Sequence, residues 1–138
     1  NERNDPKAAT WVYFDEIYLL LRDKLSSQFL YTSWKRFRKY NAYATGITQN
    51  VQDCLSNDTA YAMLANSEFV CMLRQTKDID SVVELYGLSD PQKNYLKLAK
   101  PGQGILKMGN NLIPFVNDHP TNTKIYRLLT TKPGEMEN

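Results

Sequence analysis

The sequence contains no run of about 18 apolar residues, so no segment of it is expected to span a membrane. It also has no apolar leader and no initiator methionine, which leads us to expect a piece of a longer protein. Its two cysteines, Cys54 and Cys71, form no CxxC pair, so we expect two reduced thiols that are buried as small hydrophobic residues. The net charge of +2 over 138 residues implies no strongly acidic or basic partner for the chain as a whole.

A phosphate-binding loop of the form G-x-x-x-x-G-K-[ST] is also missing, and the glycine-rich stretch "GQGILKMG" does not match it. Without that loop and its lysine, the chain alone is expected to bind nucleotide weakly and not to hydrolyse it. The single histidine, His119, argues against a metal centre or a Ser/His catalytic triad.

What the sequence does contain is an ordinary globular composition, with 42% hydrophobic and 23% charged residues, in a length that suits one domain. Apolar runs and helical periodicities alternate: strands at 11–14, 42–50 and 67–75, helices at 17–21, 26–41, 51–66, 79–86 and 89–99, and a hairpin at 105–115. This alternation predicts an α/β sheet that is parallel in its central part, flanked by helices, with a C-terminal β-hairpin.

Local signals mark several boundaries of these elements. The continuous apolar run at 11–14 is typical of a strand that is buried on both faces. The signals for the other elements are a helix cap at Ser26 or Ser27, a left-handed stop at Gly87, a capping box of Ser89 with Gln92, and an edge strand marked by Pro114.

Polar residues follow the first two predicted strands. Asp15 and Glu16 come directly after the first, and Gln49 ends the second. In α/β sheets, function gathers at the carboxyl ends of the strands. Asp15 could hold Mg²⁺ and Glu16 could activate a water, while the amide of Gln49 could bond both a γ-phosphate and that water. The alternatives are acids that complement a helix dipole and a polar strand terminus.

A basic run, "KRFRK" at residues 35–39, precedes the second strand. It could contact nucleic-acid phosphates, supply an arginine to a neighbouring subunit's nucleotide, or form a solvated helix face. Trp34, Phe37 and Tyr40 recur at helical spacing and are expected in the core. Arg74, near the end of the third strand, could face a phosphate or form a salt bridge.

With these residues in view, the chain resembles the C-terminal part of the conjugative-transfer ATPases of type IV secretion systems, the TraE/TrbE-like branch of the HerA–FtsK class of RecA-like motors. The matching segments follow the family's order: "VYFDEIYLLL", "WKRFRKYNAYATGITQNVQD", "SEFVCMLRQTKDIDSVVELYGLSDPQKNYL" and "PGQGILKMGNNLIPF". The resemblance covers roughly residues 10–133.

The resemblance implies a partial RecA-like sheet, with residues 1–138 as the C-terminal portion of an ATPase domain whose Walker A half lies upstream. It implies ATP and Mg²⁺ as cofactors of a hexameric parent that drives pilus assembly and DNA or protein transfer. The expected partners are other secretion components, with possible DNA contact, and the expected location is cytoplasmic, at the inner face of the cell membrane. No nucleotide is expected to stay tightly bound to the chain alone.

By position in the family's motifs, the resemblance assigns a role to each candidate residue. Asp15 matches the metal-shell acid, Glu16 the catalytic base, Gln49 the sensor and Arg38 an arginine that can face the adjoining subunit, with Arg74 and Asp53 as weaker matches for nucleotide contact. Two other functions remain open: a non-enzymatic module that docks secretion-system partners, and a basic nucleic-acid-binding domain.

Overall fold

The computed structural model describes residues 8–49 and 51–130. The chain divides into two compact units. The first unit comprises Asn1–Ser67 with Lys77–Leu88, and the second comprises Glu68–Thr76 with Ser89–Asn138. None of the helices in the described ranges is long and apolar enough to cross a bilayer.

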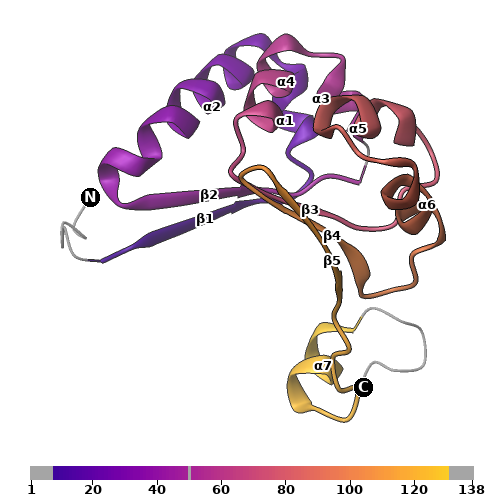
Figure 1. Cartoon of the computed structure of the whole chain (residues 1–138). Coiled ribbons are helices and arrows are strands. Elements are labelled where there is room, and N and C mark those ends of the chain that lie inside the picture. Colours follow the sequence, from indigo (N-terminus) through magenta and orange to yellow (C-terminus); the bar gives the residue numbers. More distant parts are fainter. Residues whose placement is uncertain (1–7, 50, 131–138) are drawn as a thin grey trace. The chain divides into compact units, whose positions relative to one another are not determined.

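The first unit is built on two parallel strands, β1 and β2 (Figure 1). The register runs from Thr10 opposite Ala42 to Phe14 opposite Gly46. The elements of this unit are β1 (Thr10–Phe14), α1 (Tyr18–Arg22), α2 (Lys24–Phe37), the 3-10 turn η1 (Arg38–Tyr40), β2 (Ala42–Gly46), α3 (Val51–Leu55), α4 (Asp58–Ala65) and α5 (Ile79–Tyr86).

The prediction that this first strand is buried on both faces is wrong. Trp11 and Tyr13 are 61% and 65% exposed, and the Trp11 ring stacks on that of Tyr43 with centroids 4.6 Å apart. Successive strand residues point to opposite faces. The face that carries Phe14 packs on Trp34 of α2, whereas the aromatic face (Trp11, Tyr13 and Tyr43) is left to solvent.

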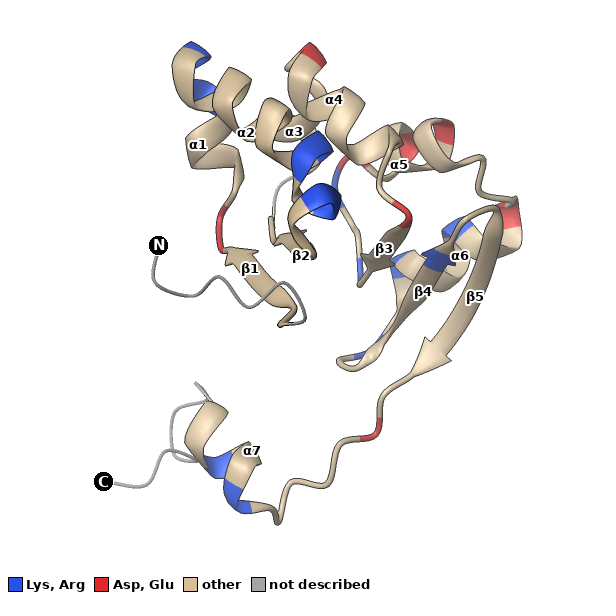
Figure 2. Ribbon diagram, turned by 90° about the vertical axis from the view of Figure 1, so that its left-hand side faces the viewer, with Lys and Arg blue, Asp and Glu red and all other residues tan. Residues whose placement is uncertain are grey.

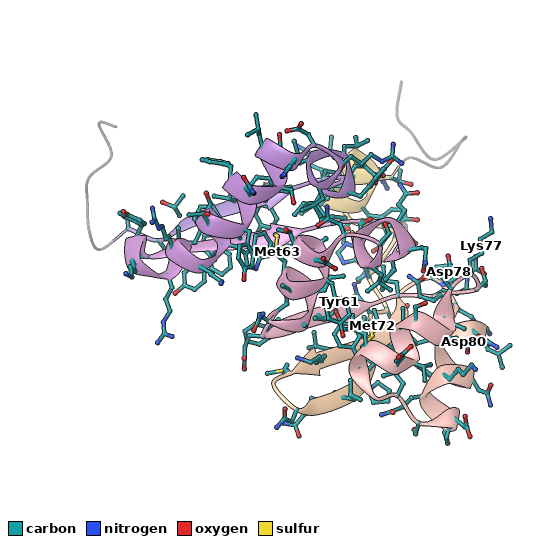
Figure 3. All side chains as sticks on the ribbon, turned by 90° about the horizontal axis from the view of Figure 1, so that it is seen from above. Tyr61, Met63, Met72, Lys77, Asp78 and Asp80 are labelled. Atoms are coloured by element: carbon teal, nitrogen blue, oxygen red, sulfur yellow. The ribbon has the colours of Figure 1, made fainter. Side chains whose placement is uncertain are left out.

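Helices supply most of the core of the first unit. One buried cluster of this unit contains Ile17, Leu21, Leu30, Cys54, Ala60 and Met63, and Ala42, Ile79, Val82 and Leu88 are buried as well. On α4 the Met63 side chain is buried, whereas Tyr61 is exposed (Figure 3). The burial expected for Cys54 is confirmed, and Trp34 packs against the cluster. Tyr40 is 74% exposed and does not join the core, because η1 ends the helix before the third turn of the periodic stripe is complete.

The caps explain where several helices begin and end. The residue that caps α2 is Asp23, and not the expected Ser26 or Ser27: its side chain accepts from the Ser26 N–H at 2.8 Å. That hydrogen bond holds the pKa of Asp23 below its ordinary value. The left-handed stop at Gly87 is confirmed, with φ of 64° and its N–H donated to Val83. Asp78 and Asp80 flank the start of α5 at the surface (Figure 3).

The second unit is a three-stranded antiparallel sheet in the order β3-β4-β5. Its elements are β3 (Phe69–Met72), α6 (Asp90–Leu98), β4 (Gln103–Met108), β5 (Asn111–Val116) and α7 (Lys124–Leu129). The expected alternation of parallel strands therefore stops at β2. β3 pairs antiparallel with β4, because β4 has a free edge on the side away from β5. A hydrogen bond from the Gly109 N–H to the Glu68 carbonyl extends this pairing.

The local predictions for the second unit are mostly confirmed. Ser89 and Gln92 form the capping box, and β4 and β5 form the hairpin through Gly109–Asn110, with Pro114 on the edge strand. Cys71 is an exception, because its thiol is exposed and not buried; it lies on the sheet face opposite the one covered by α6. The mixed α/β class is confirmed, as one parallel and one antiparallel sheet.

Candidate functional site

The carboxyl ends of β1 and β2 bring Glu16 and Gln49 together. The Gln49 Nε2 donates to the Glu16 Oε1 at 2.7 Å. The backbone holds the two strand ends side by side: the Ile47 N–H donates to the Phe14 carbonyl at 2.8 Å, and the Ile17 N–H donates to the Ile47 carbonyl at 3.0 Å. The sequence placed both residues at the carboxyl ends of predicted strands, and the geometry brings their side chains into contact.

Glu16 has an unusual backbone conformation. Its φ is +49°, in the left-handed region that residues other than glycine seldom adopt. Its N–H donates to the Asp15 Oδ1 at 3.0 Å. Asp15 itself is exposed, and the acidic connection between β1 and α1 stands out in Figure 2. Non-glycine residues with this conformation concentrate at functional sites, which makes the pair a candidate site.

The alternative explanation, acids that complement a helix dipole, fits less well. α1 begins at Tyr18 and has no acidic residue in its first turn. It is also only five residues long, so its dipole is weak. The side chain of Glu16 is instead directed to Gln49, which lies 33 positions away in the sequence.

Arg38 lies at the opposite end of the parallel pair. It begins η1, which leads into the amino end of β2, whereas Glu16 follows the carboxyl end of β1 (Figure 1). Four steps of about 3.3 Å each separate the two ends of β2 by about 13 Å. An arginine side chain does not span that distance together with the flanking turns, so Arg38 cannot contact Glu16 of its own chain.

The remaining predicted residues are more dispersed. Arg74 is exposed and follows β3 in the second unit. The side chain of Asp53 lies outside the described part of the structure. Arg36, Arg38 and the other cations of the basic run are exposed, and the Lys35 Nζ sits 4.0 Å from the centre of the Tyr31 ring.

Two apolar residues that the sequence did not single out also shape the site. A Cβ added to Gly46 would lie 2.8 Å from the Ile17 Cδ1, so glycine at the end of β2 allows Ile17 to pack closely. Ile17 is buried and directly follows Glu16. A glycine inside the predicted strand at 42–50 was the available signal for this close approach. No residue type in the sequence signalled the left-handed Glu16.

The donor set limits how a metal could bind. Within the described ranges no group of three or more His, Cys, Asp or Glu side chains could hold a metal ion. Mg²⁺ is commonly held by one or two carboxylates together with substrate phosphates and waters, so a single exposed Asp15 is compatible with that mode. His119 contacts Thr123 at 3.4 Å and stacks on Tyr126, away from these acids in the sequence.

Comparisons with known proteins bear on this site. No protein-family model matches the chain, and a search of curated proteins finds no match. Among solved structures the chain is similar to VirB4 of Thermoanaerobacter pseudethanolicus, with 29% sequence identity and a TM-score of 0.76. The similarity covers 86% of this chain and 33% of that one, so the chain spans about a third of the VirB4 chain. The resemblance seen in the sequence is therefore confirmed as a similarity to VirB4 over most of this chain.

Proposed function

We propose that the chain is the C-terminal portion of a RecA-like ATPase domain in a longer VirB4-like protein. The observation that carries this proposal is the 2.7 Å hydrogen bond between Gln49 and Glu16 at the carboxyl ends of two parallel strands. Such strand ends are where α/β proteins bind ligands and carry out chemistry.

Each residue of the site has a role that its chemistry allows. Glu16 uses its free carboxylate oxygen to take a proton from a water molecule as that water attacks the γ-phosphorus. The bond from the γ-phosphorus to the bridging oxygen of ADP breaks, and phosphate leaves. The amide of Gln49, a donor to Glu16, still has its carbonyl to accept the second hydrogen of the water. Asp15 supports Mg²⁺, which neutralises charge on the phosphates when bound.

The phosphate loop belongs to the part of the longer protein outside these 138 residues. In this proposal the full protein is a hexamer that couples hydrolysis to pilus assembly and to DNA or protein transfer with other secretion components. It acts at the cytoplasmic face of the inner membrane, and Arg38 and Arg74 contribute to nucleotide contacts. The support for this wider role is the likeness to VirB4.

The first test uses the longer protein. Glu16→Gln keeps the shape of the side chain and removes its basicity, so hydrolysis should fall by a factor of about 10² or more while nucleotide binding is retained. Glu84→Gln, which changes an exposed glutamate on α5, is the matched control and should keep wild-type turnover. Wild-type turnover in Glu16→Gln would contradict the assigned role.

The second test uses the chain alone. Because it has no phosphate loop, phosphate release from ATP should be no faster than in buffer. Steady release that disappears in Glu16→Gln would show that the 138 residues suffice for catalysis and would contradict the proposal.

One observation favours a second candidate, a nucleic-acid-binding role. Four cations at residues 35–39 are all exposed, which suits contact with a phosphate backbone. Binding to single-stranded DNA that weakens steeply with salt, and weakens further when Lys35, Arg36 and Lys39 are replaced by alanine, would support it. Negligible affinity at low salt would exclude it.

A further inference from the structure

We propose that Asp15 is a positioning residue, whose side chain stabilises a β-bulge that directs Glu16 towards Gln49. The inference rests on the proposed function for its catalytic meaning, but the structural part stands independently. It assigns Asp15 a task at the backbone, in addition to any contact with a metal.

The backbone hydrogen bonds at the carboxyl ends of the two strands show the bulge. In a regular parallel ladder the bonds are evenly spaced along each strand. At the amino end the Thr10 N–H donates to the Asn41 carbonyl. Continued in the same register, in steps of two residues on each strand, the ladder would pair the N–H of Glu16 with the carbonyl of Ile47. The Ile47 carbonyl accepts instead from the N–H of Ile17 at 3.0 Å.

Relative to that register, one extra residue has therefore been inserted at Asp15–Glu16, directly after the last paired residues of the two strands, Phe14 and Gly46. A bulge of this kind bends the chain and re-aims a side chain, and bulges are frequent beside active sites. The bulge removes the N–H of Glu16 from the ladder, and Glu16 adopts its φ of +49° there. Both effects cost free energy, because the residue is strained and its donor has lost its strand partner.

Asp15 compensates for the lost strand partner of the Glu16 N–H, and it stabilises the strained conformation of Glu16. Its Oδ1 accepts from the Glu16 N–H at 3.0 Å, so the donor that the ladder lost is satisfied by the neighbouring side chain. Short polar side chains that bond the adjacent backbone stabilise local conformations that compete with regular structure. From this turn the Glu16 carboxylate reaches the Gln49 amide at 2.7 Å.

The proposal distinguishes an acceptor from a charge. Asp15→Asn keeps a carbonyl oxygen that can accept the Glu16 N–H, whereas Asp15→Ala has no acceptor. If Asp15 served only as a metal ligand, both substitutions would disturb the contact between Glu16 and Gln49 when the metal is present, and neither would disturb it when the metal is absent. If Asp15 is a positioning residue, Asp15→Ala disturbs the contact between Glu16 and Gln49 even without metal, and Asp15→Asn does not.

The experiment is NMR on the 138-residue chain in Mg²⁺-free buffer. The probe is the ¹⁵N-labelled side-chain amide of Gln49, identified by its loss in Gln49→Ala, and Glu16→Ala defines its position without the hydrogen bond. Asp15→Ala should move the Gln49 signal to the position found in Glu16→Ala, and Asp15→Asn should leave it near wild type. Asp118→Ala, an exposed acid in the second unit, is the matched control and should change nothing.

A signal that Asp15→Ala leaves unchanged would overturn the proposal. If Asp15→Ala fails to fold, hydrogen exchange in the wild type decides: the Glu16 backbone amide should be protected, and exchange at the rate of a free amide would overturn the proposal equally. The proposed function is tested separately, because hydrolysis that survives Glu16→Gln in the longer protein would refute it without changing either NMR result.

Discussion

The two units differ in how their strands run, and the candidate site follows that difference. In the first unit β1 and β2 are parallel, so both carboxyl ends lie at one edge and bring Glu16 and Gln49 within hydrogen-bonding distance. In the second unit β3, β4 and β5 are antiparallel, so the carboxyl end of each strand lies beside the amino end of its neighbour. Strand direction, more than composition, decides where polar termini can cooperate.

The irregularities of the two units differ as well. The first unit carries a bulge and a left-handed glutamate at the end of its strands. The left-handed positions of the second unit, Gly102 and Gly109, are glycines, which adopt this conformation without a steric cost. Among the described residues, the non-glycine residues with a positive φ are Glu16, Asn41 and Asp78, and all three lie in the first unit.

The largest expected effect compares the two ends of the parallel strands in the first unit, with Arg38 at one end and Glu16 at the other. In the longer protein, Arg38→Ala should lower hydrolysis by about 10³-fold or more if the arginine serves a neighbouring subunit's nucleotide. Mixing Arg38→Ala subunits with Glu16→Gln subunits should then restore part of the ATPase activity, because some sites combine an intact Glu16 with an intact neighbouring Arg38. Normal turnover in Arg38→Ala alone would remove it from the site.

A core substitution should show whether the second unit can be weakened separately. Leu96 on α6 has no exposed surface, and α6 packs on β4. Leu96→Ala should lower the free energy of unfolding by about 3 kcal/mol, as read from urea titration of amide signals in β4 and β5. The Gln49 side-chain signal should stay at its wild-type position before the transition. A shift of that signal in the folded state would show that the two units do not behave separately.

A pH titration should weaken the first unit selectively. Burial, with a further contribution from Cys54, raises the pKa of Tyr86 on α5 to about 12. The unfolded chain releases this proton near pH 10, so the folded state keeps more protons and loses stability as the pH rises from about 10 through 12. Because Tyr86 is only partly buried, solvent screening reduces the expected loss to about 1 kcal/mol. Urea titrations of Tyr86→Phe should lack this component, and an equal loss in that variant would contradict the assignment.

An effect of similar size addresses the strain at Glu16. Glu16→Gly should be more stable than Glu16→Ala by about 1 kcal/mol, because glycine adopts a left-handed φ without a steric penalty. Glu84→Gly, at a helical position of α5, should be less stable than Glu84→Ala by about the same amount. Thermal unfolding of the four variants measures both differences, and equal signs at the two positions would exclude strain at Glu16.

The sequence predicted what depends on local chemistry. The stop at Gly87, the capping box of Ser89 with Gln92 and the hairpin turn were readable because each needs particular residue types at fixed spacing. The meeting of Glu16 with Gln49 was predictable from parallel strand ends.

Features that depend on distant packing were not readable. The exposure of Trp11 and the antiparallel pairing of β3 depend on which elements cover each face or occupy each edge. The bulge was hidden because a glutamate, and not a glycine, takes the left-handed position.

The aromatic face of Trp11, Tyr13 and Tyr43 has a practical consequence for handling the isolated chain. In the described part of the structure, β1 and β2 pair only with each other, so each strand also has a free edge beside this face. Flat apolar surfaces next to unpaired strand edges favour association between copies, and a net charge of +2 gives little electrostatic repulsion to oppose it. Association between copies of the chain should therefore increase steeply with protein concentration. A charged residue in place of Tyr13 should raise the concentration at which the chain stays monomeric, without altering the polar site.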